Sequence, residues 1–205
     1  MRDLLFLSIQ PQSPDLSVAK SIEVRTVSIL GVFDPGVRKG RINVRVYMGG
    51  PMFTGADVAY NLRLARQLRG LGFDVYCPNE SEPINDKTRD DITAKMIYEW
   101  DITELERCNV LLCQVSEDSG TNWEAGYFDC LCRHVDRGRY YGIVGIASDI
   151  RLRTNPNPHM SGVDNQAGYL NPLVVGGLQL SLGVYLDEGA ALDRLVEVRS
   201  QREGL

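Results

Sequence analysis

Two carboxylates, Asp118 and Glu124, stand six positions apart in the segment DSGTNWEAG. The apolar run before them, 109–115, predicts a buried strand, and residues 123–134 predict a helix. Open α/β sheets bind their ligands at the carboxyl ends of parallel strands. A carboxylate in that place can act as a nucleophile, and two carboxylates in different surroundings can divide nucleophilic and acid–base work. The spacing therefore predicts a catalytic site at this strand end.

Other chemically informative residues fall at the end of an expected strand or on an expected helix. Tyr47 precedes the segment GGPMF at 49–53, and Asp101 lies in YEWDITEL. The pair Gly49 and Gly50 predicts a tight turn, which would also let a ligand approach the backbone closely. The turn matches neither GxGxxG nor GxxxxGK[ST], so it is not a phosphate-binding loop of those kinds.

Each of these residues also has a simpler structural explanation. Glu124 could only complement the dipole of its helix, and Asp118 could only be a turn residue or an N-cap. Asp101 could be a solvated helix acid, although its apolar neighbours in the sequence favour a place near the apolar face. Tyr47, taken alone, is more simply a packing residue in a strand. The N-cap role of Asp118 is compatible with a role in the site.

Alternating strands and helices must position these side chains. The hydrophobic pattern predicts strands at 42–50, 73–78, 109–115 and 140–149, and helices at 56–71, 90–107, 123–134 and 188–199. A long loop is expected at 151–168 and a mixed segment from 170 to 187. This order is typical of an α/β fold, here a flavodoxin-like doubly wound sandwich with a mostly parallel five-stranded sheet. Residues 1–40 are expected to be an N-terminal extension of unknown role, and 41–205 the α/β domain.

Composition narrows the choice of partners. The net charge is −5, so no broad basic surface is expected and nucleic acid is disfavoured as a partner. The five cysteines have no metal-binding spacing, which predicts reduced cysteines in the core. This spacing predicts no metal site, and no organic cofactor is expected either. With no apolar run of about 20 residues and no secretory cleavage site, the chain is expected to be cytoplasmic and to make no membrane contact.

Taken together, the motif Tyr-x-Gly-Gly-Pro-x-Phe starting at Tyr47, the acid Asp101 and the motif Asp-x-Gly-x-x-x-Glu starting at Asp118 resemble the nucleoside 2-deoxyribosyltransferase family. The resemblance extends over residues 44–177. It implies transfer of 2-deoxyribose between nucleobases of 2′-deoxynucleosides by double displacement, as in a retaining glycosidase with a base in place of water. Free nucleobases and 2′-deoxynucleosides are the implied partners, whereas purine-only or broader base specificity is left open.

The resemblance also implies residue roles. Glu124 is expected to be the nucleophile that forms a covalent deoxyribosyl ester. Asp118 and Asp101 are expected to hold the base and handle its proton. Tyr47 is expected to orient the nucleophile with its hydroxyl.

Substrate binding is implied for a second group of residues, namely Gly49, Gly50, Phe53 and Asn171. In the family, a neighbouring subunit completes each site with an asparagine that binds the sugar 5′-hydroxyl, and Asn171 is expected in that role within a homo-oligomer. The family often carries a C-terminal aromatic residue near the site, whereas this chain ends QREGL.

Two alternative functions are compatible with the sequence. One is a hydrolase of 2′-deoxynucleoside 5′-monophosphates on the same fold, which would need groups for the 5′-phosphate. The first loop, GGPMFTG, contains no arginine or lysine, which favours a free 5′-hydroxyl. The other is a non-catalytic nucleotide-binding module. Three carboxylates in the expected pocket disfavour a sensor for an anionic ligand.

Overall fold

One five-stranded parallel sheet organises the described part of the chain. The structure, a computed structural model, describes residues 43–81, 85–86, 88–149 and 170–204, all within one compact unit, Gly40–Leu205. The strands, in sheet order, are β2 (Asp74–Tyr76), β1 (Arg45–Gly49), β3 (Val110–Gln114), β4 (Gly142–Ile146) and β5 (Val184–Tyr185). Every pairing among them is parallel. The predicted α/β fold class is confirmed.

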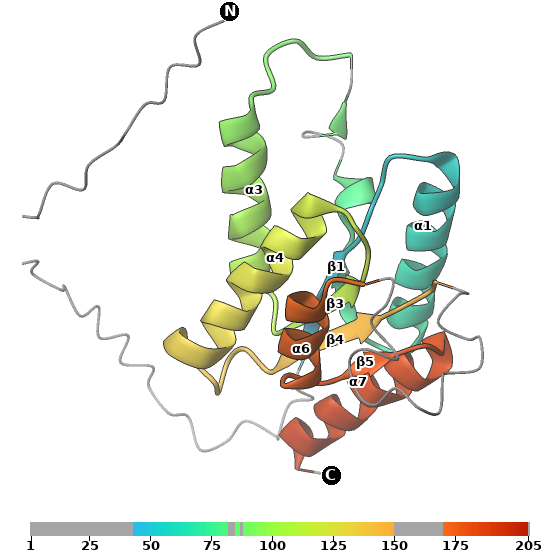
Figure 1. The fold of residues 1–205 in the computed structure, drawn as a ribbon, viewed down its shortest axis with the longest axis vertical. Coiled ribbons are helices and arrows are strands. Elements are labelled where there is room, and N and C mark those ends of the chain that lie inside the picture. The colour runs from blue at the N-terminus through green and yellow to red at the C-terminus, as the bar shows by residue number, and fades with distance from the viewer. Residues whose placement is uncertain (1–42, 82–84, 87, 150–169, 205) are drawn as a thin grey trace, which may run out of the picture. The chain divides into compact units, whose positions relative to one another are not determined.

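Helices cover both faces of this sheet. The main ones are α1 (Gly55–Gly70), α3 (Ala94–Arg107), α4 (Ser119–Cys130), α6 (Pro172–Gln179) and α7 (Glu188–Glu203). A 3-10 turn, η1 (Pro78–Glu80), follows β2, and a π-helical turn, η2 (Leu131–Val135), extends α4. Figure 1 shows α3, α4 and α6 on one side of the strands and α1 and α7 on the other.

Side-chain alternation along the strands builds one core on each face. Val46 and Met48 of β1 pack in the core with α1 and α7, whereas Tyr47 points into the core with α3, α4 and α6. Along β3, Val110 and Leu112 belong to the first core, and Leu111 and Cys113 belong to the second. This period of two is the reason that Tyr47 lies on the α4 face.

The chain changes faces between neighbouring strands at the centre of the sheet. After β1 the chain enters α1, which covers one face of the sheet, and after β3 it enters α4, which covers the opposite face. The strands β1 and β3 are neighbours in the sheet. Such a switch point opens a crevice at the carboxyl ends of the two strands. The segments expected to carry the chemistry begin at these two strand ends.

Some predicted boundaries are wrong. Helix α4 begins at Ser119 instead of 123 because the Asp118 side chain caps it. Helix α3 begins at Ala94 instead of 90, capped by the side chain of Thr93. The sequence pattern located neither β5, which has two residues, nor α6 in the mixed segment. Cys130 is exposed, contrary to the expectation that the cysteines are core residues.

Other expectations lie outside the described residues. These are the N-terminal extension at 1–40 and the long loop at 151–168. Among the helices that are described, none has the length and apolar character needed to cross a membrane.

Candidate active site

A tyrosine–glutamate hydrogen bond lies at the centre of the site. Tyr47, fully buried on β1, donates its hydroxyl to Glu124 Oε1 at 2.6 Å. Glu124 is the sixth residue of α4, so it lies beyond the first turn, where a helix dipole acts most strongly. The helix-dipole explanation for this acid is therefore weak.

Gly49 leaves the space that Glu124 occupies. A Cβ atom on Gly49 would lie 3.0 Å from Glu124 Oε2 and 3.2 Å from Leu111 Cδ1. Contacts this short are tighter than side chains normally make, so a larger residue would displace the carboxylate or the strand. This glycine serves the site by being small.

Burial makes Glu124 an unusual acid. The pKa of Glu124 is raised to about 8: desolvation is the largest cause, the hydrogen bond from Tyr47 lowers it, and the charges of Asp101 and Asp118 raise it. The pKa of Tyr47 is itself raised well above its usual value by burial and by the neighbouring Glu124. The tyrosine is therefore a fixed hydrogen-bond donor at any ordinary pH.

Asp101 is the second acid with altered ionisation. It is half-buried on α3, and desolvation raises its pKa to about 6. Its charge acts on both Glu124 and Tyr47, so the three groups share one electrostatic environment. The structure therefore places Asp101 near the Tyr47–Glu124 pair.

An aromatic pair anchors this part of α3 to the sheet end. Trp100, next to Asp101, donates Nε1 to the Tyr76 hydroxyl at 2.9 Å. The Tyr76 ring packs on the Tyr47 ring, with 5.1 Å between the centroids. These contacts link the part of α3 next to Asp101 to Tyr47 on β1. Trp100 itself is partly exposed, with 38% of its surface accessible.

Asp118 combines a structural role with a place in the site. Its Oδ2 accepts hydrogen bonds from Thr121 N at 2.9 Å and Thr121 Oγ1 at 2.5 Å, and its Oδ1 accepts from Gly120 N at 3.3 Å. The carboxylate is thus held at the N-terminus of α4. It still lies close enough to raise the pKa of Glu124.

The structure does not draw all predicted residues into this cluster. Phe53 is 77% exposed beside the start of α1. Asn171 is an exposed N-cap whose Oδ1 accepts from Leu173 N at 3.0 Å in its own helix, α6. Gly50 lies on the other side of the crevice, against Gln114.

A group of carboxamides in that opposite wall was missed in the sequence. Asn61 of α1 is 4% exposed, and it contacts Gln114 of β3 and Asn79 of η1. Gln114 could have been noticed in the sequence because it is a polar residue at the end of the apolar strand VLLCQ. Asn61 could have been noticed only as a single amide on an otherwise apolar helix face, which is weak evidence for a role in a site.

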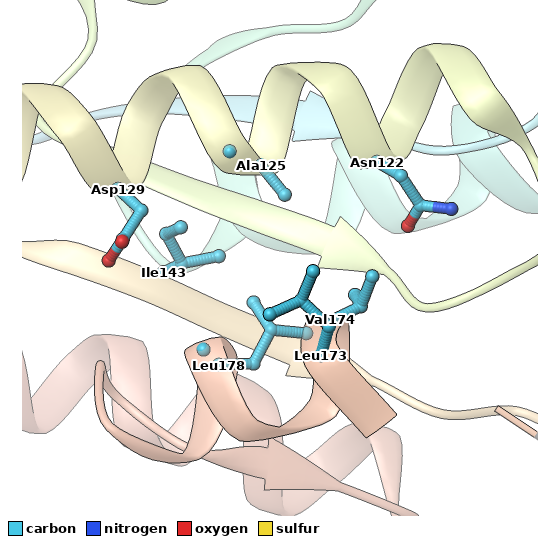
Figure 2. A pocket seen from close by; sticks show the side chains of 9 residues that line it. Asn122, Ala125, Asp129, Ile143, Leu173, Val174 and Leu178 are labelled. Carbon is cyan, nitrogen blue, oxygen red and sulfur yellow. The ribbon is translucent and has the colours of Figure 1, made fainter. Parts of the chain in front are cut away.

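One cavity lies away from these acids. It measures about 290 Å³ between α4 and α6, and Figure 2 shows Ala125 and Asn122 of α4 facing Leu173, Val174 and Leu178 of α6. None of the three acids lines it. Its lining is mostly apolar and offers few converging polar groups, so the cluster of acids at the strand ends is the stronger candidate for chemistry. Within the described residues, no group of three or more His, Cys, Asp or Glu side chains has the arrangement of a metal site.

The fold and the acids define an α/β protein with clustered carboxylates at the carboxyl edge of a parallel sheet. Residues 46–136 match the model of the family described as Nucleoside 2-deoxyribosyltransferase. The resemblance found in the sequence is therefore confirmed over this stretch, which includes Tyr47, Asp101, Asp118 and Glu124 but not Asn171. The match points to a nucleoside 2-deoxyribosyltransferase-like function.

Solved structures resemble the chain over most of its length. A conserved protein from Enterococcus faecalis V583 is 26% identical, with a TM-score of 0.59 over 76% of this chain and 98% of that one. A 2-deoxyribosyltransferase from Bacillus psychrosaccharolyticus is 14% identical, with a TM-score of 0.49 over 73% of this chain and 91% of that one. No curated protein matches the chain.

Proposed function

We propose that this protein transfers 2-deoxyribose between the nucleobases of 2′-deoxynucleosides through a covalent deoxyribosyl–Glu124 intermediate. The observation that carries the proposal is the 2.6 Å hydrogen bond from Tyr47 to Glu124 in a cluster with two further carboxylates. The bond fixes one carboxylate oxygen and leaves Oε2, beside Gly49, as the attacking atom.

The first half-reaction breaks the glycosidic bond. Glu124 Oε2 attacks C1′, the C1′–N bond breaks, and its electron pair goes to the leaving base. Asp101 or Asp118 donates a proton to a ring nitrogen of the base, which would otherwise be a poor leaving group. The product is a deoxyribosyl ester with inverted configuration at C1′.

The second half-reaction reverses these events with a new base. A ring nitrogen of the acceptor base attacks C1′, the ester C–O bond breaks, and the electron pair returns to the Glu124 carboxylate. The carboxylate of the acid–base pair takes the proton of the attacking nitrogen. Two inversions restore the β configuration.

The reactive protonation state has Glu124 ionised and Asp101 protonated. With a pKa of about 8 for Glu124 and about 6 for Asp101, this state is a minor form of the free protein. Because the two carboxyl groups interact, the pKa values read from the two limbs of a pH–rate profile describe the pair and neither residue alone. A nucleoside bound over the crevice would change both values by excluding water.

The free 5′-hydroxyl is favoured over a 5′-phosphate by the first loop. Residues 49–55 contain no cationic side chain, and the three carboxylates would repel a phosphate dianion. These features disfavour both the monophosphate hydrolase and a sensor for anionic nucleotides.

A second copy of the chain is the proposed occupant of the α4–α6 face. Trp123 on α4 is 67% exposed, Leu173 on α6 is 84% exposed, and Leu180, the C-cap of α6, is 78% exposed. Exposed apolar groups gathered next to an apolar cavity are typical of interfaces between subunits. Asn171 is the exposed N-cap of α6, so an interface on this face would bring it near the neighbouring copy.

Base exchange tests the proposed function directly. The protein is mixed with deoxyinosine and adenine in phosphate-free buffer, and products are separated by chromatography. Deoxyadenosine and hypoxanthine are the expected products. Hypoxanthine with free deoxyribose and no deoxyadenosine would indicate a hydrolase, and exchange that persists in Glu124→Ala would contradict the covalent mechanism.

A further inference from the structure

The crevice has a second wall that carries amides instead of acids. Asn61 and Gln114 both lie on the α1 face of the sheet, opposite the face that carries Tyr47 and Glu124. Gln114 is the last residue of β3, and the loop from β1 to α1 passes directly beside it. The amide wall and the acid wall therefore meet at the ends of β1 and β3.

The amides form a connected set of hydrogen bonds. Gln114 Nε2 donates to Asn61 Oδ1. Asn61 Nδ2 donates to Pro51 O at 3.0 Å and to Asn79 Oδ1 at 2.8 Å. Both amide hydrogens of Asn61 and its oxygen are engaged at a position that is 4% exposed. A buried amide with its polar atoms satisfied has little freedom to rotate.

The same amides contact the backbone of the first loop. Asn61 holds the Pro51 carbonyl, and Gly50 lies so close to Gln114 that a Cβ there would be 2.5 Å from Nε2 and 2.7 Å from Cδ. Gly49, one residue earlier, lies against Glu124 Oε2. A displacement of the loop by about an ångström would therefore change the room in front of the nucleophile, and such displacements can cost about 100-fold in rate.

We infer that Gln114 and Asn61 are positioning residues, which hold Gly50 and Pro51 in the conformation that forms the sugar-binding side of the crevice. The inference rests on the proposed function, since the readout is binding of a 2′-deoxynucleoside. It assigns these amides no proton transfer. Their loss should raise KM and leave the ionisation of the acids in place.

A double-mutant cycle tests this role. Gln114→Ala removes the clamp, and Gly50→Ala places a methyl group where Nε2 and Cδ of Gln114 now lie. Each single variant should raise the KM for deoxyinosine about tenfold or more. The double variant should resemble Gln114→Ala alone, because the atoms that clash with the new methyl group are gone. The inference would be overturned if the rise in KM of the double variant were the product of the rises in the two single variants. It would also be overturned if the KM of the single variants were unchanged.

Two further variants separate positioning from loss of packing. Gln114→Met keeps the length of the side chain without the amide, and it should also raise KM. Gln67→Ala removes an exposed amide of α1 that accepts from Arg63, and it should leave KM unchanged. The limbs of the kcat pH profile should stay in place in all these variants. A shift of either limb to another pH would mean that the amides change the ionisation of the acids.

Hydrogen exchange distinguishes failure of this inference from failure of the proposed function. Amide protection of residues 49–54 should fall in Gln114→Ala and Gln114→Met but not in Gln67→Ala. If the unmodified protein exchanges no bases, the proposed function fails while this loss of protection still supports the positioning role. Unchanged protection of the loop would overturn the positioning role whether or not the protein is active.

Discussion

Tyr47 and burial have opposite effects on the ionisation of Glu124. Burial raises the pKa of this carboxyl, the tyrosine hydroxyl lowers it by stabilising the ionised form, and the net pKa is about 8. A nucleophilic carboxylate needs the ionised form, whereas a dry crevice favours the neutral one. The tyrosine is therefore the group on which the reactivity of the proposed nucleophile depends.

Removal of this hydroxyl should widen the pH profile while lowering the rate. In Tyr47→Phe the pKa of Glu124 rises above about 8, so the alkaline limb of kcat/KM moves to higher pH. The maximum falls by about 10- to 100-fold, as expected for a lost hydrogen bond to a charged group. The measurement is base exchange from pH 5 to 10. Tyr127→Phe, which removes a surface hydrogen bond to Glu106, is the control and should behave like the unmodified protein. An unchanged profile in Tyr47→Phe would contradict this role.

The raised pKa of Glu124 also predicts how stability varies with pH. Its folded-state pKa of about 8 lies above the ordinary value of 4.5, so the folded state loses stability as pH rises between these values. Glu124→Gln should match the unmodified protein below pH 4.5 and be more stable by roughly 1–3 kcal/mol above pH 8. Urea unfolding at pH 4.5 and pH 9 measures the difference.

The control for this stability prediction is Glu99→Gln. Glu99 is an exposed helix acid that pairs with Lys95 at 3.5 Å, so its substitution should change stability little at either pH. A difference for Glu124→Gln that is the same at both pH values would show that the carboxyl is not held in its neutral form.

Among the elements, α4 has the closest link to the site, because its N-cap is itself one of the three acids. Asp118 accepts from two backbone amides of the first turn, which sets where α4 begins. Glu124 then lies on the part of the helix that faces Tyr47. The position of one acid is thus fixed by the capping interactions of another.

Two substitutions at Asp118 separate these roles. Asparagine caps a helix about as well as aspartate, so Asp118→Asn should keep its stability but lose at least about 100-fold in exchange rate. Asp118→Ala should in addition lose about 1 kcal/mol of stability. Thermal unfolding and the exchange assay measure the two effects.

Asp187→Ala provides the matched control for helix capping. Asp187 caps α7 through Ala190 N at 2.9 Å, so this variant should lose similar stability and keep its activity. A normal exchange rate in Asp118→Asn would remove Asp118 from the reaction and leave it only a structural role.

For the whole molecule, assembly is the main proposed requirement. If a second copy covers the α4–α6 face, Leu173→Glu should convert the oligomer to monomers, because a charge would be buried at the interface. The monomer should keep its fold, since Leu173 is 84% exposed in the single chain. Exchange activity should fall with dissociation if Asn171 completes the neighbouring site. Light scattering coupled to chromatography and the exchange assay measure both.

The control for assembly is Leu71→Glu, at the end of α1 on the opposite helix layer. It should keep the oligomeric state of the unmodified protein. The cross-subunit site would be contradicted if Leu173→Glu dissociated and still kept full activity. The proposed interface would be contradicted if the unmodified protein were already a monomer.

Much of the fold and of the acid cluster could be predicted from the sequence. The alternation of apolar strands with amphipathic segments predicted the α/β class, because the period of side-chain burial differs between strand and helix. The spacing of Asp118 and Glu124 pointed to this strand end, and the family resemblance added Tyr47 and Asp101; the structure places the four residues in one cluster. The two-residue strand β5 could not be found, since two residues carry no period.

The sequence by itself determined which functional groups the chain carries and at which strand ends they stand. Only the tertiary structure decided how those groups ionise and what holds them. The pKa values of Glu124 and Asp101 depend on burial by segments far away in the chain. The amide wall joins α1, η1 and β3, which no local pattern connects. Desolvation and hydrogen bonding depend on distances in space, and these exist only once the sheet has brought its strand ends together.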